Sequence, residues 1–232
     1  MSKKITIAVD AMGGDNSPEK VINGISIHFK NSQNIFYKIF GNSEKIKKII
    51  PSSLPTNSYE LTHTEQEVKG TDSALSAAKR GKDTSMWLTI NSVKNNESDI
   101  AISAGNTGAL FVIAKLNLKM IENIDKPALS GLWPNKQGMN IVLDLGANIE
   151  CSEKNLIDFS LMGSALFKSL FDNEIAKVAL LNIGSEEQKG NTIIKNTFQT
   201  LSNTKKPLYE FHGYIEGSHI MDGDVNVIVT DG

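Results

Sequence analysis

Five times along the chain, a short apolar run ends in a loop that combines glycine with Asp, Asn or Glu. These loops occupy residues 10–15, 103–108, 144–148, 184–191 and 230–232. Apolar residues at helical spacing follow the first four loops, so strand-like runs alternate with helices. This alternation is typical of an α/β protein with a mostly parallel sheet. We therefore expect residues 1–232 to form a single α/β domain.

The loop at residues 103–108 has the sequence Ser-Ala-Gly-Asn-Thr-Gly, in which every side chain is small. The apolar run before it, at residues 99–103, predicts a short buried strand. Apolar side chains at helical spacing then predict a helix over residues 109–120. A glycine-rich turn that opens a helix presents free backbone N–H groups at the positive end of the helix dipole, which suits phosphate.

Two interpretations of this loop stay open. In the first, Ser103 to Gly108 cradle an anion, and glycine is needed because a Cβ at Gly105 or Gly108 would block close backbone approach or a positive φ. In the second, Asn106 or Thr107 simply caps the following helix. The pattern matches neither the dinucleotide fingerprint nor the P-loop, so it favours neither of those ligands.

The loop at residues 10–15 follows a β-rich run at residues 5–9, which predicts a central strand buried on both faces. It holds a glycine pair, Gly13 and Gly14, between two carboxylates, Asp10 and Asp15. Taken alone, it is explained equally well by a turn with capping aspartates and by a binding site.

In open α/β sheets, ligands bind beyond the carboxyl ends of the strands. Because five strand ends carry glycine with polar side chains, we predict that the five loops converge on one sheet edge and form a polar anion pocket. The last strand stops at residues 230–232 without the helix that should cover it. We therefore expect a C-terminally shortened form.

Composition argues against several classes of protein. The net charge is −2 and Arg80 is the one arginine, whereas nucleic-acid readers favour a basic field and bidentate arginines, so we expect no nucleic-acid partner. The one cysteine, Cys151, permits no internal disulfide, and we interpret it as a buried structural thiol. The four histidines lack metal-ligand spacing, so we expect no metal site. No run approaches the roughly 18 apolar residues of a membrane span, and we expect a cytoplasmic protein.

Taken together, six segments resemble the bacterial phosphate acyltransferase family, the acyl-carrier-protein:phosphate transacylases of phospholipid synthesis. The first, Asp-Ala-Met-Gly-Gly-Asp near the N-terminus, is the most specific. The resemblance covers essentially the whole chain, in order and at compatible spacing. Members normally continue past Thr-Asp-Gly, and Ser185 stands where a threonine is expected. The matching segments are 8–15, 103–110, 143–148, 181–191, 216–223 and 227–232.

The resemblance implies a three-layer α/β/α fold like that of isocitrate and isopropylmalate dehydrogenases. It implies the conversion of long-chain acyl-carrier protein and inorganic phosphate to acyl phosphate and free carrier protein. No cofactor is implied, since phosphate is the co-substrate. Acyl carrier protein is the implied partner, together with a homodimer and peripheral membrane association.

The chemistry of this reaction suggests a role for each candidate residue. Phosphate is already a nucleophile and a thiol of pKa about 8.5 is a good leaving group, so no Ser–His–Asp triad is required. The protein has to position phosphate and supply donors to the developing oxyanion. The predicted phosphate-binding residues are Gly13, Gly14, Asp15, Ser103, Gly105, Thr107 and Gly108. The predicted catalytic and loop-orienting residues are Asp10, Asn106, Asp144, Asn148, Lys189 and Asp231.

Lys189 is the best local cation for phosphate. Glu186 and Glu187 would repel phosphate unless they pair with Lys189, so we assign them a structural role first. The cluster of Lys79, Arg80 and Lys82 is interpreted as a solvated helix end, with an anion or acidic-partner contact as the alternative.

Two alternative functions stay open. The first is another enzyme of the same fold, either a short-chain phosphotransacetylase or a nicotinamide-dependent dehydrogenase. The second is a shortened, non-catalytic form that binds phosphate or acyl carrier protein.

Overall fold

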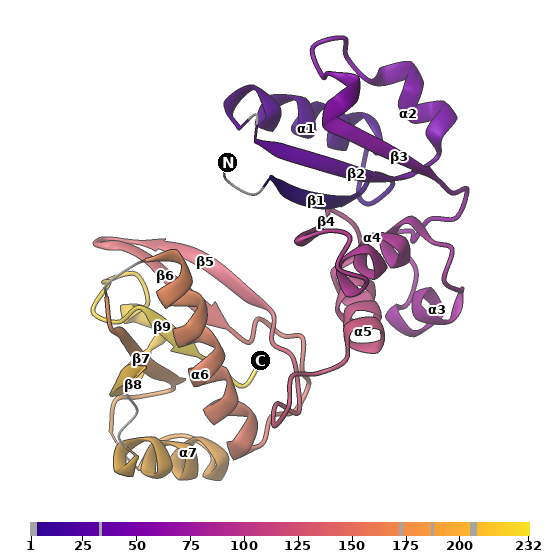
Figure 1. Ribbon diagram of the computed structural model, residues 1–232. Coiled ribbons are helices and arrows are strands. Elements are labelled where there is room, and N and C mark those ends of the chain that lie inside the picture. The colour runs from indigo at the N-terminus through magenta and orange to yellow at the C-terminus, as the bar shows by residue number, and fades with distance from the viewer. Residues whose placement is uncertain (1–3, 33, 172–173, 187, 205–207) are drawn as a thin grey trace. The chain divides into compact units, whose positions relative to one another are not determined.

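The computed structural model describes residues 4–32, 34–171, 174–186, 188–204 and 208–232 (Figure 1). The chain divides into two compact units, Met1–Lys119 and Met120–Gly232, where the sequence pattern predicts one domain. Each unit has its own sheet and its own apolar core. Among the described residues, strands before residue 120 pair with one another and strands after it do the same, so their apolar faces are buried in separate groups.

The first unit contains a four-stranded parallel sheet in the order β3-β2-β1-β4. Helices α1 and α2 lie on one face and α4 on the other, with α5 packed against α4 and α3 against α5 (Figure 1). The elements are β1 (Ile5–Asp10), α1 (Glu19–Asn31), β2 (Ile35–Gly41), α2 (Ser43–Ile49), η1 (Thr56–Ser58), β3 (Tyr59–His63), α3 (Ala74–Lys79), α4 (Ser85–Lys94), β4 (Ile100–Ser103) and α5 (Thr107–Leu118).

Strand β1 is central and its residues Ile7 to Asp10 are buried, which confirms the prediction for the first strand. Strand β4 differs from its prediction. Ile100 and Ile102 are each 48% exposed, so this strand is not fully buried. The reason is that β4 forms an edge of the sheet, where a side chain has a neighbouring strand on one side only.

The second unit contains a five-stranded sheet in the order β5-β6-β9-β7-β8, in which only β5 runs antiparallel to its neighbour. Helices α6 and α7 pack on one face of it (Figure 1). The mostly parallel α/β fold class is thus confirmed in both units. The elements are β5 (Ser130–Asn135), β6 (Gly138–Leu143), α6 (Glu153–Leu170), β7 (Ala176–Asn182), α7 (Thr192–Asn203), β8 (Tyr209–Glu216), η2 (Gly217–His219) and β9 (Val227–Val229).

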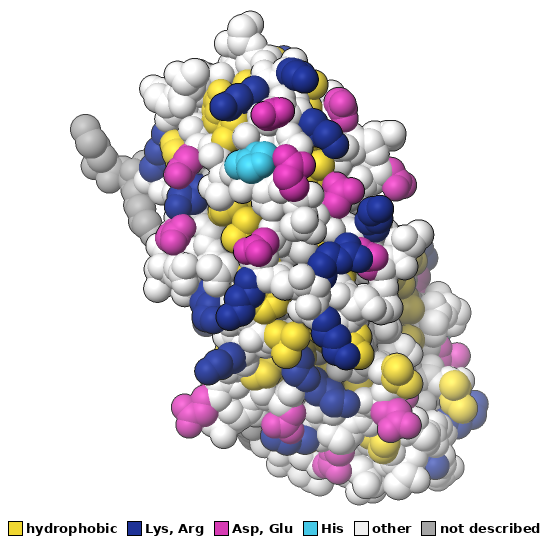
Figure 2. Space-filling view, turned by 90° about the vertical axis from the view of Figure 1, so that its right-hand side faces the viewer, with side chains coloured by type: hydrophobic (Ala, Val, Ile, Leu, Met, Phe, Trp, Pro, Cys, Tyr) yellow, Lys and Arg dark blue, Asp and Glu magenta, His cyan; other side chains and the backbone are white. Residues whose placement is uncertain are grey.

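Acidic and basic side chains are intermixed over the face shown in Figure 2, in keeping with the near-neutral net charge. Apolar side chains on this face form small, separate groups between them. Within the described residues, no helix has both the length and the apolar character needed to cross a membrane.

Candidate functional site

The loops that follow β1 and β4 lie against each other in the first unit, because these two strands are neighbours in the sheet. A Cβ placed on Gly13 would lie 2.7 Å from Asp10 Oδ2, 2.8 Å from Ser103 Oγ and 2.9 Å from the backbone N of Gly105. Gly14 has a φ of +92°, and a Cβ there would collide with the carbonyl oxygen of Ala104. The structure therefore brings together the predicted residues Gly13, Gly14, Ser103 and Gly105. At positions 13 and 14 only glycine fits.

Asp10 is buried directly beneath these paired loops, with 1% of its surface exposed. The Ser103 hydroxyl donates to Asp10 Oδ2 at 2.7 Å, and the backbone N–H of Met12 donates to Oδ1 at 3.2 Å. Burial raises the pKa of Asp10 above its ordinary value, and the hydroxyls of Ser85 and Ser103 offset part of that effect. A carboxyl with a raised pKa is more readily neutral, which reduces its repulsion of a nearby anion.

Ser103 is itself fully engaged. Its oxygen accepts from the backbone N–H of Gly105 at 3.1 Å while its hydroxyl donates to Asp10. Ser103 therefore fixes the loop conformation, and its hydroxyl proton is not available to an anion.

Ser85, the first residue of α4, is a member of this site that sequence reasoning missed. It is 1% exposed, and its hydroxyl lowers the pKa of Asp10 although it forms no hydrogen bond of regular geometry. A serine one residue after a capping threonine carries no local signal of such a role, because its contact depends on how α4 packs on β1.

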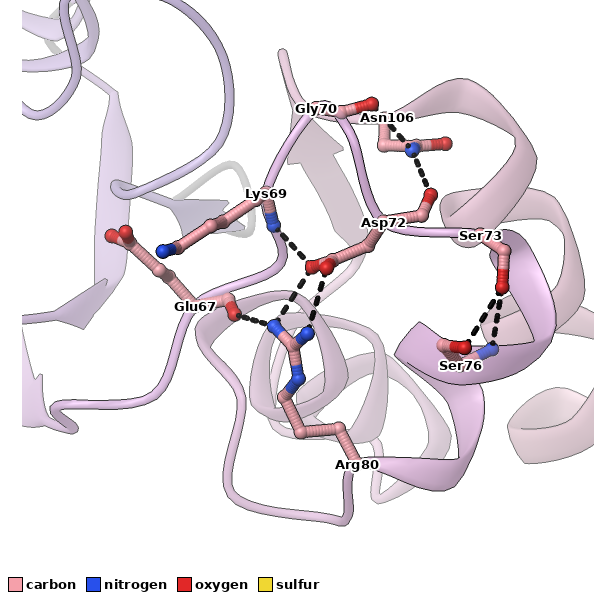
Figure 3. A network of polar contacts seen from close by, with 8 residues as sticks. All are labelled: Glu67, Lys69, Gly70, Asp72, Ser73, Ser76, Arg80 and Asn106. Carbon is pink, nitrogen blue, oxygen red and sulfur yellow. Dashed lines mark hydrogen bonds and ion pairs between the residues drawn. The ribbon is translucent and has the colours of Figure 1, made fainter.

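Asn106 caps helix α5, as the second interpretation of its loop proposed. Its Oδ1 accepts from the backbone N–H of Ala109 at 3.0 Å. Its Nδ2 donates to the carbonyl oxygens of Gly70 at 3.0 Å and Asp72 at 2.8 Å (Figure 3). The Asn106 side chain is thus occupied by structural bonds and acts on the site through the helix that it caps.

The remaining predicted residues of this loop are less constrained. Thr107 and Gly108 are exposed in the first turn of α5. A Cβ on Gly108 would meet only ordinary contacts, 3.5 Å from Asn106 and 3.6 Å from Ala74, so packing within the protein does not require glycine there. At Gly105 the need is real, since a Cβ would lie 3.0 Å from the Met86 side chain and 3.2 Å from the Cα of Gly13. Neither of these two glycines has a positive φ.

In the second unit, Asp144 organises the loop after β6. It is fully buried, and its two oxygens accept from the backbone N–H groups of Leu129 at 2.8 Å, Ala147 at 3.3 Å and Asn148 at 2.8 Å. The Asn148 side chain adds a fourth donor at 2.8 Å and also donates to Pro127 O at 2.9 Å. These bonds saturate the Asp144 carboxylate, so in this structure it orients its loop.

The loops after β7 and β9 lie beside this one, as the neighbouring positions of the three strands require. Asn191 caps α7 through the N–H of Ile194 at 2.9 Å and donates to Asp231 at 3.3 Å. A Cβ on Gly232 would lie 2.5 Å from the carbonyl oxygen of Asn148. The predicted residues Asn148 and Asp231 are therefore brought to one edge of the second sheet.

Lys189 pairs with Glu186 at 2.9 Å, and both side chains are about half exposed. The hydrogen bond between them raises the pKa of Lys189 and lowers that of Glu186. The expected pairing is observed for Glu186, and Glu187 lies outside the described residues.

The predicted convergence of all five loops on a single sheet edge is wrong. Two loops, 10–15 and 103–108, follow strands of the first sheet, and three loops, 144–148, 184–191 and 230–232, follow strands of the second. The loops do sit at carboxyl ends of parallel strands, where ligands bind in such sheets. The error lies in the number of sheets, which the local pattern does not encode.

A family model described as "Fatty acid synthesis protein" matches residues 5–232. The chain belongs to the fatty acid synthesis protein family. The "Phosphate acyltransferase" of Pelagibacter ubique (strain HTCC1062) is 68% identical over 232 residues, which are 100% of this chain and 69% of that protein. The "Phosphate acyltransferase" of Parvibaculum lavamentivorans is 42% identical over 236 residues, covering 100% of this chain and 64% of that protein. The chain thus spans about two thirds of the length of these relatives.

A phosphotransacetylase structure from Streptococcus pyogenes matches the fold, with a TM-score of 0.69 and 14% sequence identity. The match covers 100% of this chain and 78% of that one. At this identity it shows a shared fold. The resemblance of this fatty acid synthesis protein to the phosphate acyltransferases rests instead on the sequence matches, and those confirm it.

The first unit also has an apolar cavity of about 400 Å³ beside the paired glycine loops. Asp10 and Ala104 form its border with those loops. Sequence reasoning missed it because four separate elements contribute its walls. Its apolar walls come from Ile7, Val9, Val21, Ile25 and Ile102, with Gly24 between them on α1.

Cys151 is buried as predicted, and its pKa is raised by burial first and by the charge of Asp144 next. Across the described residues, no three His, Cys, Asp or Glu side chains are grouped so as to hold a metal ion. The expectation that this family member needs no cofactor stays a prediction.

Proposed function

We propose that this chain is a phosphate acyltransferase that transfers a long-chain acyl group from acyl carrier protein to inorganic phosphate. The observation that carries the proposal is the pair of glycine loops after β1 and β4, found in a chain 68% identical to a protein of that name. A phosphate oxygen attacks the thioester carbonyl carbon, the carbon–sulfur bond breaks, and the carrier-protein thiol leaves with the electron pair and then takes a proton.

In this reaction, most of the rate enhancement comes from positioning phosphate against the thioester carbonyl. Phosphate is ionised at neutral pH and a thiol of pKa about 8.5 leaves readily, so neither reactant needs a covalent intermediate on the protein. Backbone N–H groups of Gly13, Gly14 and the 103–108 loop would hold phosphate and the developing oxyanion beside the positive end of α5. Asp10 and Ser103 would keep those loops in place.

The acyl chain would lie in the apolar cavity bordered by Asp10 and Ala104. The volume of about 400 Å³ falls in the range of roughly 300–1,000 Å³ typical of small-molecule sites. Burial of the chain there would place its thioester end next to the glycine loops.

In the second unit, Lys189 would be free to meet an anion once it exchanges its Glu186 partner, while Asp144, Asn148 and Asp231 hold the loops at that sheet edge. Acyl carrier protein would be the partner of the reaction. We also propose a cytoplasmic homodimer that associates peripherally with the membrane, as inferred from the sequence resemblance.

The test is to mix palmitoyl-acyl carrier protein, inorganic phosphate and the purified protein, and to follow the product by phosphorus NMR alongside the release of free thiol. We expect acyl phosphate and thiol to appear in equal amounts. Binding of phosphate by a folded protein without any turnover would favour the non-catalytic alternative. Turnover of acetyl-coenzyme A in preference to the long-chain substrate would favour a short-chain phosphotransacetylase.

A further inference from the structure

Arg80, at the C-terminal end of α3, binds the segment 67–72 through its guanidinium. Its guanidinium donates to both carboxylate oxygens of Asp72, each at 2.7 Å, and to the carbonyl oxygen of Glu67 at 2.9 Å (Figure 3). Such a two-pronged bond requires the planar arginine fork, which lysine cannot reproduce. Arg80 therefore differs from the solvated helix end predicted for it.

The hydrogen bonds of Asp72 hold residues 67–72 as a fixed loop. Besides Arg80, its carboxylate accepts from the backbone N–H of Lys69 at 2.7 Å. The Arg80 hydrogen bond is the main reason that the pKa of Asp72 is lowered, so this carboxylate stays charged at neutral pH. The side chain of Asp72 is 14% exposed and that of Arg80 is 34% exposed, so solvent reaches the pair only in part.

This fixed loop holds the start of helix α5. The carbonyl oxygens of Gly70 and Asp72 both accept from Asn106 Nδ2 (Figure 3). Asn106 Oδ1 in turn caps α5 at Ala109. Arg80, Asp72 and Asn106 thus form one continuous chain of hydrogen bonds. It ends at the loop whose Gly105 packs against Gly13.

We propose that Arg80 is a positioning residue for phosphate binding, acting through Asp72 and Asn106 on the first turn of α5. The inference rests on the proposed function, in which the 103–108 loop holds phosphate. Without the fork, the carbonyl groups of Gly70 and Asp72 are free to move, and Asn106 loses the partners that fix its amide. The exposed N–H groups of the first turn of α5 then spend less time in the geometry that phosphate requires.

The test compares Arg80→Lys, which keeps the charge but not the fork, with Lys82→Ala, an exposed cation two residues away. We expect Arg80→Lys to raise the KM for phosphate about tenfold, on the scale of one charge-assisted hydrogen bond. The KM for acyl carrier protein should stay unchanged, and Lys82→Ala should behave as wild type. Asp72→Asn should reproduce the Arg80→Lys effect without changing the arginine.

A double-mutant cycle separates positioning from a general structural role. Since Arg80 acts through Asn106, Arg80→Lys should add little to the phosphate KM of an Asn106→Ala background. Equal effects of Arg80→Lys in both backgrounds would overturn the proposal. A lowered melting temperature with an unchanged phosphate KM would also overturn it, as would a raised KM for acyl carrier protein alone.

Direct titration of inorganic phosphate by calorimetry makes the result independent of turnover. If the wild-type protein bound phosphate but formed no acyl phosphate, the proposed function would fail, whereas weaker phosphate binding by Arg80→Lys would still support the role of Arg80. Equal phosphate affinity in wild type and Arg80→Lys would overturn that role even if the enzyme were active.

Discussion

Ser103 donates a 2.7 Å hydrogen bond to Asp10, its direct register partner on the neighbouring strand, and so ties together the ends of β1 and β4. Because both residues stand at the carboxyl ends of their strands, the bond also joins the two glycine loops that follow. The buried carboxyl and the loop geometry are therefore one structural unit.

The first prediction concerns pH. Burial raises the pKa of Asp10 above its ordinary 3.8 in the folded protein. A raised folded pKa means that the folded state binds the proton more tightly than the unfolded state, so the contribution of Asp10 to stability is largest below pH 3.8 and is lost as pH rises through the folded value. We therefore compare the free energies of unfolding of Asp10→Asn and wild type. As pH rises through this window, we expect their difference to shift in favour of Asp10→Asn, and above the window we expect it to stay constant. Parallel pH curves from urea unfolding would contradict the assignment.

The second prediction concerns packing at Gly13. Gly13→Ala places a Cβ within 3 Å of atoms of Asp10, Ser103 and Gly105, so we expect a loss of about 1–3 kcal/mol of stability from overpacking. Gly24→Ala is the matched control, because its Cβ would meet no atom within 4 Å in the interior of α1. It should stabilise the protein by about 0.5–1 kcal/mol. Denaturant unfolding of both variants measures this, and equal effects would refute the packing described here.

The third prediction concerns Asp144. Asp144→Ala leaves several partly buried N–H donors without an acceptor, each at a cost of about 1 kcal/mol, so we expect a total loss of about 3 kcal/mol. Asp15→Ala, at an exposed position, should stay within about 0.5 kcal/mol of wild type. Guanidinium unfolding distinguishes the two. A small loss in Asp144→Ala would show that water replaces the carboxylate.

The fourth prediction concerns the acyl chain. Gly24 lines the apolar cavity and has free space beside it, so Gly24→Leu should fill part of the cavity without disturbing α1. We expect turnover of long-chain acyl-carrier protein to fall while that of a short-chain thioester is retained, with Gly24→Ala close to wild type. An equal loss at both chain lengths would place the acyl chain elsewhere.

Local sequence patterns predicted most of the strands and helices, because each strand-like run and each helix start carries its own signal. Asn106, for example, is a recognisable cap, and the structure uses it as one. The division into two sheets has no such signal, since the pairing partner of a parallel strand is not marked in the strand itself. The same limit applies to Ser85 and to the two carbonyl partners of Asn106, which lie 36 and 34 residues away in sequence.

Among the ion pairs, those between residues close in sequence are easier to predict than those between distant residues. The sequence suggests a pairing of Lys189 with the glutamates beside it, and Lys189 does pair with Glu186, three residues away. The bond between Arg80 and Asp72 spans eight residues and depends on the turn between them, so the sequence pattern suggested only a solvated cluster.

In the proposed reaction, the paired glycine loops of the first unit bind the phosphate that accepts the acyl group. The most direct measurement is the rate of thiol release from palmitoyl-acyl carrier protein as a function of phosphate concentration, for wild type and for Gly14→Val. We expect a saturable dependence on phosphate in wild type, and no phosphate-dependent release in a Gly14→Val protein that still unfolds cooperatively. Phosphate binding by these loops would be contradicted if the rate of thiol release in wild type did not depend on phosphate concentration, or if turnover in Gly14→Val were unchanged.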